Sequence, residues 1–494
     1  MKFSIKPTDP GKLETDVLIV TPKDLYKVVK KDHPLSLLIS EAFEKEQFED
    51  KLGNFLFLST KGYIGAYKLL IAGIGENTFD YSELLNFTAK ICRKVSEIKT
   101  AKVAFVVPEI MLKKFTVGEA VSGIIEAFSL SSYKFLKYKS EEEQKKVRSI
   151  EEVILCLAAR SLGGIDESIK KGEVFSQATL FARDLVNEPS DTTTPSYLSK
   201  VAEEIAKKNP SRINVKIYSR EDALKMGMNA YLSVAKGSDE EPKFIRLSYK
   251  PKGPKKKVVL VGKGITFDTG GLSLKGAEHM ETMKLDMAGA ATVLAVFSAL
   301  SQYPCDFEVV GLIAACENMP SGKALKPGDI LRAMNGKTIE VLNTDAEGRL
   351  TLADALSYAV INEKPDVIID LATLTGACMV ALGQDIAGLW GNDEKLLEKI
   401  DSCAKNTGEQ LWKMPIHKDY KELIKSNIAD LKNIQTGRYG GAITAALFLS
   451  EFVGQTPWVH LDIAGPAFAE QESSLTPKGG TGYGVRLILD FLTS

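Results

Sequence analysis

The N-terminal third of the chain alternates short apolar runs with amphipathic stretches. Four apolar runs rich in β-branched residues predict strands: 16–20, 55–59, 68–75 and 102–107. Residues 81–98 instead repeat their apolar positions with the spacing of a helix. Because strands that alternate with helices are typical of an α/β domain, we predict a smaller N-terminal α/β domain over residues 1–150.

The second half of the chain repeats this alternation in longer units. Four further runs predict strands: 256–264, 307–316, 366–374 and 458–465. These runs lack the period-two alternation of a sheet with one wet face, so both faces of their sheet should be covered by helices. We therefore predict a larger α/β domain over residues 176–494, with a central mixed sheet flanked by helices.

The segment between these two domains is strongly charged. Residues 138–153 predict a solvated surface segment near the boundary, and residues 167–188 have helical spacing. We expect residues 151–175 to form a helical linker region.

Length, composition and charge set broad limits on function. The chain has 494 residues, of which 44% are hydrophobic and 26% charged, which is an ordinary balance for a folded protein. Its formal net charge of −1 argues against a protein built mainly to neutralise nucleic-acid phosphates. The basic run 250–257 contains Pro and Gly and predicts an exposed turn. The most apolar stretch is interrupted by Asp370, so we expect no membrane span.

Cysteine and histidine usage narrows the metal chemistry that the chain can support. The six cysteines are scattered without a C-x-x-C pair, and the N-terminus lacks a secretory signal, so we expect reduced thiols in a cytoplasmic protein. Only four histidines are present and none lies in an H-E-x-x-H motif. A metal would therefore be held largely by carboxylates.

The first cluster of chemistry-bearing residues begins at the end of the predicted strand at 256–264. Lys263, Asp268, Lys275 and Asp286 surround a Gly-Gly turn, where sites of open α/β sheets lie. The dinucleotide pattern fails because Phe267 replaces its third glycine, and the spacing of a P-loop is absent. Ordinary surface charges or ion pairs are the alternative interpretation of these four residues.

The second cluster is NTDAEGRL at 343–350. If the chain stays extended there, Asp345, Glu347 and Arg349 project to one side. An Asx turn with a helix cap is the equally weighted alternative. The negative charges of the four carboxylates in the two clusters need nearby positive charge, which two divalent cations about 3.5–4 Å apart would supply. Oxygen ligands suit Mg²⁺ or Mn²⁺, and Zn²⁺ tolerates them.

Together these segments resemble the leucine aminopeptidase family of two-metal hexameric exopeptidases. NTDAEGRL matches the signature octapeptide of that family. VGKGITFDTGG, MKLDMAGAA, DLATLTGA, GGAITAALFLSEFV, WVHLDIAGPA and GTGYGVRLILDFL resemble further family blocks in family order. The resemblance is strong over residues 180–494 and extends to the N-terminal part only by general architecture.

The resemblance implies a role for each residue of the two clusters. A tighter metal site would be formed by Lys263, Asp268, Asp286 and Glu347. A more exchangeable site would be formed by Asp268, Asp345 and Glu347. Water activated between the two cations would attack the scissile carbonyl. Lys275 would stabilise the oxyanion, and Arg349 would hold a bicarbonate that shuttles protons.

The resemblance also implies a substrate pocket for the first side chain of a peptide with a free N-terminus. Its lining would be Met283, Thr373, Gly376 and Ala464, with the Leu374 carbonyl receiving the amine. A core methionine is the alternative for Met283. Leu-like residues should be preferred, although Ala467 leaves the pocket size open. Two further departures from the family pattern, Asp191 and Ala288, fall on no proposed ligand.

We therefore expect a cytoplasmic, homohexameric aminopeptidase with two Mn²⁺ or Zn²⁺ ions per subunit. Two alternatives remain from the sequence. One is a nucleic-acid-binding regulator on the same scaffold, which the near-zero net charge and the small basic run disfavour. The other is an inactive scaffold, which the complete set of ligand and catalytic residues disfavours.

Overall fold

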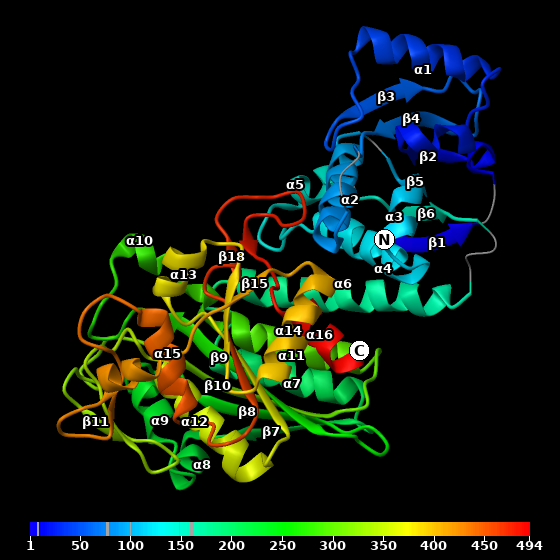
Figure 1. Ribbon diagram of the computed structural model, residues 1–494. Helices are drawn as coiled ribbons and strands as arrows, with labels where there is room; N and C mark the ends of the chain where they lie inside the picture. Colours follow the sequence, from blue (N-terminus) through cyan, green and yellow to red (C-terminus); the bar gives the residue numbers. More distant parts are fainter. Residues whose placement is uncertain (7–8, 76–78, 99, 148, 159–162) are drawn as a thin grey trace. The chain divides into compact units, whose positions relative to one another are not determined.

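The computed structural model divides into two compact units, each described here by itself (Figure 1). It describes residues 1–6, 9–75, 79–98, 100–147, 149–158 and 163–494. The N-terminal unit consists of Met1–Gln177 and Glu472–Pro477. The larger unit consists of Ala178–Gln471 and Lys478–Ser494.

The N-terminal unit is built on a sheet that has six strands among the described residues, in the order β1-β6-β5-β2-β4-β3. The strands are β1 Lys2–Lys6, β2 Thr15–Val20, β3 Phe55–Ser59, β4 Ala66–Ala72, β5 Lys102–Val106 and β6 Glu152–Cys156. Neighbouring strands are parallel except for β3, which runs antiparallel to β4. The four strands predicted in this part of the sequence all belong to this sheet.

Helices cover both faces of this sheet. Alternate residues of β2 face opposite cores: Val17 packs with the helices α2 Tyr81–Ser96, α3 Glu109–Lys114 and α4 Val117–Ser131, and Leu18 packs with α1 Pro34–Lys45. The start of α2 is fixed locally by a capping box, in which Asp80 accepts from the Glu83 amide and Glu83 accepts from the Asp80 amide. The unit therefore has an α/β core of its own.

The expected helical linker at 151–175 differs in detail from the structure. Its first residues form β6, which pairs with β1 and β5 inside the N-terminal sheet. Its later residues begin α6 Ile165–Asn187, close to the predicted helix at 167–188. β6 is only five residues long and begins with the charged Glu152, and its strand partners are remote in sequence. The charged stretch before it contains the exposed helix α5 Glu141–Lys146.

The larger unit is built on a mixed sheet that has eight strands among the described residues, in the order β15-β14-β17-β13-β9-β10-β8-β7. The strands are β7 Ile213–Tyr218, β8 Lys243–Tyr249, β9 Lys257–Asp268, β10 Glu308–Asn318, β13 Val367–Ala372, β14 Ala387–Gly391, β15 Leu411–Lys413 and β17 Trp458–Asp462. The four central strands β17, β13, β9 and β10 run parallel. β8 and β14 run antiparallel to their inner neighbours.

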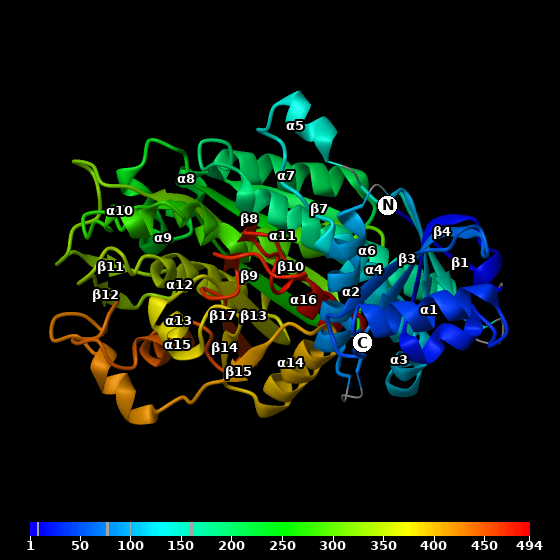
Figure 2. The same ribbon diagram turned by 90° about the horizontal axis from the view of Figure 1, so that it is seen from above.

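Helices pack on both faces of this sheet, as the apolar strands predict (Figure 2). One face carries α7 Pro195–Lys208, α11 Ala288–Leu300, α14 Glu394–Thr407 and α16 Val485–Thr493. The other carries α9 Asn229–Val234, α12 Gly348–Tyr358 and α15 Gly441–Ser450. Shorter elements of the unit are α8 Arg220–Lys225, α10 Ala277–Met280, η5 Met283–Met287, β11 Ile330–Arg332, β12 Thr338–Glu340, α13 Gly376–Leu382, β16 Leu431–Lys432, β18 Phe468–Ala469 and β19 Gly479–Gly480.

One helical stretch, Ala277–Leu300, has the length and the mean hydropathy of 1.5 that a membrane span needs. However, 78% of its apolar window is buried inside the unit. Its long segment α11 packs against β9, β10 and β13, so its apolar residues belong to the core beneath the sheet.

Candidate active site

The predicted site residues gather at one edge of the central sheet of the larger unit. The parallel strands β9, β10 and β17 end at Asp268, Asn318 and Asp462, and β13 lies between β9 and β17. Because parallel strands present their carboxyl ends at the same edge, the loops that leave them meet there. Polar side chains that are distant in sequence therefore become neighbours.

Lys263 lies at the centre of this group. Its Nζ is 2.7 Å from Asp286 Oδ1 and 2.9 Å from Glu347 Oε1, and it donates to the Thr373 carbonyl at 2.9 Å. A Cβ added at Gly348 would come within 2.5 Å of the Lys263 Cε atom. Glycine at position 348 therefore allows the lysine stem to pass directly under the start of α12.

Lys275 binds the outer pair of carboxylates. Its Nζ is 2.9 Å from Asp268 Oδ2 and also pairs with Asp345 Oδ1. The loop that carries it turns back at Gly270 and Gly271, which both have positive φ, and closes when the Lys275 amide donates to the Thr269 carbonyl at 2.9 Å. The Gly-Gly turn thus returns Lys275 to the strand end from which the loop started.

Three of the predicted ligands form a buried carboxylate cluster. Asp268, Asp286 and Glu347 each offer one oxygen, and these three oxygens lie within 4.8 Å of one another. Asp286 Oδ2 and Glu347 Oε2 are buried and have no hydrogen-bond partner among the described residues. Burial raises the pKa of both Asp286 and Glu347, because few water molecules can stabilise their charged forms.

The charges of this cluster fit divalent cations. Four carboxylates face two lysines, so negative charge is in excess. Burial alone would lower the pKa of Lys263, but Asp286 and Glu347 outweigh it and raise that pKa. Unpartnered buried oxygens and an excess of negative charge are what a divalent cation satisfies. Lys263 could join the ligands after losing its proton, as metal binding requires of its ligands.

Arg349 lies in the first turn of α12 and is almost fully buried. Its Nη1 donates to the Asn433 carbonyl at 2.8 Å, while its Nε has no partner among the described residues. Burial lowers the pKa of Arg349 to about 10, so the guanidinium stays charged at neutral pH. The side chain therefore offers a free donor on a buried cation, which suits an anion.

The signature segment is a turn, so the extended chain that would project Asp345, Glu347 and Arg349 to one side does not form. The Asp345 amide donates to Asn343 Oδ1 at 2.8 Å, which makes an Asx turn, and Glu347 has helical backbone angles as the residue just before α12. The Asx turn of the alternative interpretation is therefore observed, but Glu347 makes no capping hydrogen bond with its side chain at the start of α12. The turn still directs Asp345 to Lys275 and Glu347 to Lys263.

The predicted pocket residues lie on loops around the carboxylate cluster. Thr373 follows β13, and its hydroxyl donates to Asp286 Oδ1 at 2.7 Å. Leu374 and Ala464 are half-buried, and Gly376 is exposed, with no atom within 4 Å of an added Cβ. Met283 is half-buried on η5, three residues before Asp286. The space beside Gly376 is therefore open to a ligand.

Sequence reasoning missed three polar residues that hold the site in place. Asn318 donates to Asp268 Oδ1 at 2.8 Å and to the Thr344 carbonyl at 3.0 Å. Asn433 and Asp462 hold the turns on either side of the cluster. Asn318 and Asp462 are the last residues of β10 and β17, so their place at a strand end was a usable signal. Asn433 lies in an irregular segment, and no local pattern marks it.

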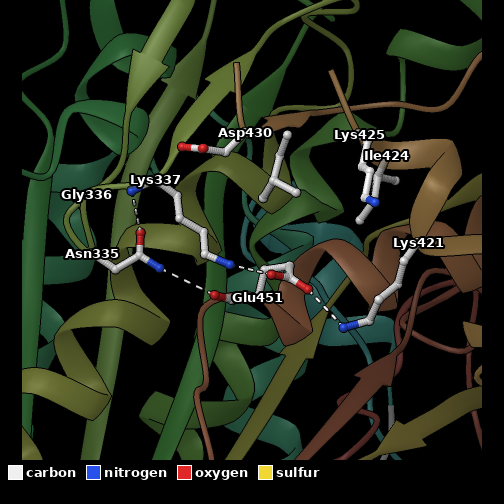
Figure 3. A pocket seen from close by; sticks show the side chains of 9 residues that line it. Asn335, Gly336, Lys337, Lys421, Ile424, Lys425, Asp430 and Glu451 are labelled. Carbon is white, nitrogen blue, oxygen red and sulfur yellow. Dashed lines mark hydrogen bonds and ion pairs between the residues drawn. The ribbon is translucent and has the colours of Figure 1, made fainter. Parts of the chain in front are cut away.

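A pocket of about 490 Å³ lies elsewhere in this unit. Its lining is Asn335, Gly336, Lys337, Lys421, Ile424, Lys425, Asp430, Leu431 and Glu451. Figure 3 shows that Lys337 and Lys421 reach the Glu451 carboxylate from opposite sides, and the Lys421 contact is 3.0 Å. No predicted site residue lines this pocket, and its Glu451 carboxylate is already paired with two lysines, so the carboxylate cluster remains the candidate active site.

Models of known protein families match parts of both units. The catalytic-domain model of the cytosol aminopeptidase family matches residues 180–489, and the N-terminal-domain model matches residues 19–142. A probable cytosol aminopeptidase of Sulfurihydrogenibium sp. (strain YO3AOP1) is 44% identical over 466 residues, covering 94% of this chain and 91% of the relative. Another, of Aquifex aeolicus (strain VF5), is 44% identical over 457 residues, covering 91% and 89%.

Two solved structures are similar to this chain over nearly its whole length. A mutant of tomato leucine aminopeptidase has a TM-score of 0.86 at 34% identity, covering 100% of this chain and 96% of its own. The bottromycin maturation enzyme BotP in complex with Mn has a TM-score of 0.84 at 30% identity, covering 97% and 99%. The resemblance that the sequence motifs indicate is thereby confirmed. The chain belongs to the cytosol aminopeptidase family and is a metal-dependent aminopeptidase with both domains of that family.

Proposed function

We propose that this aminopeptidase releases leucine-like N-terminal residues from peptides with the help of two divalent cations. The proposed ligands are Lys263, Asp268, Asp286, Asp345 and Glu347. One observation carries the proposal: the oxygens of three buried carboxylates lie within 4.8 Å of one another, and two further oxygens of this group lack partners among the described residues. Such a group is stable at neutral pH only with added positive charge.

The ions are proposed to be Mn²⁺ or Zn²⁺. Carboxylate oxygens with one amine make a mixed donor set that either ion accepts. The related enzyme BotP was solved in complex with Mn, which supports manganese as the first ion to test. When bound, the two ions would activate water and polarise the scissile carbonyl.

Lys275 is proposed to stabilise the negative charge that develops on the carbonyl oxygen. The Lys275 ammonium lies between Asp268 and Asp345, directly beside the carboxylate cluster. Burial alone would lower the pKa of Lys275, but Asp268 and Glu347 outweigh it and raise that pKa, so the side chain is a fixed cation. A fixed cation next to the reacting carbonyl lowers the energy of the tetrahedral intermediate.

Arg349 is proposed to hold a bicarbonate ion that accepts and returns protons. Two observations support this role: its Nε has no partner among the described residues, and its guanidinium is charged although buried. The planar guanidinium matches a planar anion in size and hydrogen-bond geometry. This residue would hold the proton carrier without itself touching the substrate.

The first residue of the substrate is proposed to bind on the Thr373–Gly376 loop and near Ala464, with Met283 as a further wall. The Leu374 carbonyl would accept a hydrogen bond from the free amine, and binding of that amine to one of the metal ions would restrict the enzyme to the first peptide bond. Small side chains at Gly376 and Ala464 leave room for a medium-sized apolar group. This supports a preference for leucine-like residues.

We further propose a homohexamer that works in the cytoplasm. The hexamer is what the resemblance of the sequence motifs to the family implies. The cytoplasmic location is supported by the name of the relatives and by six cysteines that are all buried free thiols. The nucleic-acid alternative gains little from the basic run, because Lys255 pairs with Asp306 at 2.7 Å and Lys257 with Glu308 at 3.1 Å.

Hydrolysis of leucine p-nitroanilide by the purified full chain tests the proposal. Activity should disappear after treatment with a chelator and return when Mn²⁺ or Zn²⁺ is added. Glu347→Ala should remain inactive at every metal concentration, because this carboxylate faces both proposed ion positions. Failure of the metal-loaded wild-type protein to cleave any substrate with a free amine would show that the proposal is wrong.

A further inference from the structure

Asp462 is a buried carboxylate with an unusual number of main-chain partners. It ends β17, and only 1% of its surface is exposed. Asp462 Oδ1 accepts from the amides of Leu374 at 3.2 Å, Thr375 at 3.4 Å and Ala464 at 3.2 Å. Asp462 Oδ2 accepts from the Thr375 hydroxyl at 2.7 Å. One side chain therefore satisfies four donors that come from two loops.

These two loops are the ones on which substrate recognition is proposed. The first loop follows β13 and contains Thr373, Leu374 and Gly376. The second loop follows β17 and contains Ala464. Their strands are neighbours in the sheet, but Leu374 and Asp462 are 88 residues apart in sequence. Asp462 thus joins two opposite parts of the proposed pocket through hydrogen bonds.

The peptide group between Thr373 and Leu374 is held at both ends. Its N–H donates to Asp462, and its carbonyl accepts from Lys263 Nζ at 2.9 Å. Because a trans peptide directs its N–H and its carbonyl to opposite sides, these two contacts fix the orientation of the whole plane. The Leu374 carbonyl follows on the same loop, so its direction depends on this plane.

The Thr375 hydroxyl extends the same arrangement to a helix. It donates to Asp462 Oδ2 and accepts from the Cys378 amide at 3.0 Å, which caps the N-terminus of α13. Asp462 therefore also fixes where α13 starts, at Gly376. Burying a carboxylate costs stability unless hydrogen bonds compensate for the lost water, and here four hydrogen bonds from the two loops do so.

We propose that Asp462 is a positioning residue for substrate recognition, which sets the distance between the two loops that bind the first residue of the peptide. This inference rests on the proposed pocket. Asp462 acts through Leu374, Thr375 and Ala464, and it does not touch the substrate or the metal ligands. Loosening it should change how tightly and how selectively the first residue binds, while the metal ions remain bound.

The test compares Asp462→Asn with a matched control, Asp354→Asn. Asp354 is equally buried and also joins two segments, because it accepts from the amides of Tyr231 at 2.9 Å and Met334 at 2.8 Å. It lies on α12 and makes no contact with the two loops through these bonds. The control therefore reports the general effect of removing a buried bridging carboxylate from this unit.

Full-length, manganese-loaded proteins are assayed for kcat and KM with leucine and alanine p-nitroanilide, and bound manganese is counted. For Asp462→Asn, the KM for the leucine substrate should rise about ten-fold, the size of the loss of one hydrogen bond to a charged group. The leucine-to-alanine ratio of kcat/KM should fall, and the manganese content should match that of the wild-type protein. Asp354→Asn should keep the wild-type KM and ratio.

Wild-type values of KM and of the ratio in Asp462→Asn would overturn the inference, as would an equal rise of KM in Asp354→Asn. If Asp462→Asn fails to fold, Thr375→Val and Thr375→Ser decide instead. Valine removes the hydroxyl and should raise KM, while serine retains it and should restore the wild-type value; equal KM values for the two overturn the inference. If the wild-type protein itself cleaves neither anilide, the proposed function fails instead.

Discussion

At the scale of single residues, the charge balance around Lys275 predicts a specific kinetic effect. We expect Lys275→Ala to lower kcat by about 10²–10³, the usual loss for one donor to a developing oxyanion. Bound manganese should stay at the wild-type level, because Lys275 contributes no proposed ligand atom. Steady-state kinetics on leucine p-nitroanilide and a metal count on the same preparation check both statements.

Lys337→Ala is the matched control for this substitution. Lys337 also pairs with a half-buried carboxylate of the larger unit, Glu451, but it lines the separate pocket of Figure 3. We expect its kcat to equal that of the wild-type protein. An unchanged kcat in Lys275→Ala, or an equal loss in both variants, would contradict the oxyanion role.

Asp354 gives the stability of the protein a predictable pH dependence. Burial raises the pKa of the Asp354 carboxyl to about 7, whereas in an unfolded chain it titrates near 4. The folded protein therefore holds this proton more tightly, and its stability falls as the pH rises from about 4 to about 7. Asp354→Asn cannot titrate, so its deficit in melting temperature relative to wild type should be smaller at about pH 8 than at about pH 5.

Melting curves of the two proteins at both pH values measure this difference directly. Between about pH 5 and about pH 8, the melting temperature of the wild-type protein should fall by more than that of the variant. Equal losses would mean that Asp354 does not carry the titration and that other groups set the pH dependence.

At the scale of elements, one irregular segment after β16 fixes the turn that carries Asp345. The Asn433 side chain accepts from the Leu342 amide at 2.8 Å and donates to the Asn343 carbonyl at 2.6 Å and to the Ala346 carbonyl at 3.3 Å. Its backbone carbonyl also accepts from Arg349. Four contacts from one residue therefore hold both ends of this turn and the start of α12.

We expect Asn433→Ala to weaken manganese binding by about 10–100-fold, the usual loss when a residue that orients metal ligands is removed. Titration calorimetry on metal-free protein measures this affinity without an activity assay. Asn392→Ala is the control, because Asn392 also joins two segments of the unit, accepting from the Trp458 amide at 2.8 Å and donating to the Thr456 carbonyl at 2.9 Å. Equal manganese affinities of Asn433→Ala and Asn392→Ala would show that Asn433 does not orient the metal ligands.

Elements also show where local pattern succeeds and where it fails. The residues of β2, β9 and β10 are buried on both faces of their sheets. Such strands are apolar along their length, so local composition is enough to predict them. Pattern fails at the turn 343–347, because an Asx turn and an extended chain contain the same residue types. Tertiary contacts from Asn433 and Lys263 select the turn.

At the scale of the whole molecule, family membership predicts a hexamer. Light scattering on the purified chain should give six times the mass of one subunit, and the value should not change with protein concentration in the micromolar range. A stable monomer that still cleaves leucine p-nitroanilide would show that assembly is not required for a complete site. The same sample can be tested for nucleic-acid binding at low salt, where we expect no complex.

The sequence by itself determined the fold class, the family and the residue types of the site. Apolar runs predict the strands. The motif blocks single out Lys263, Asp286 and Glu347, because the expected metal chemistry needs their side chains. Tertiary structure alone decided which carboxylate oxygens remain unpartnered and which peptide planes are fixed. Those properties depend on contacts between residues far apart in the chain, such as Asp462 with Leu374 and Asn318 with Asp268, and no local pattern records them.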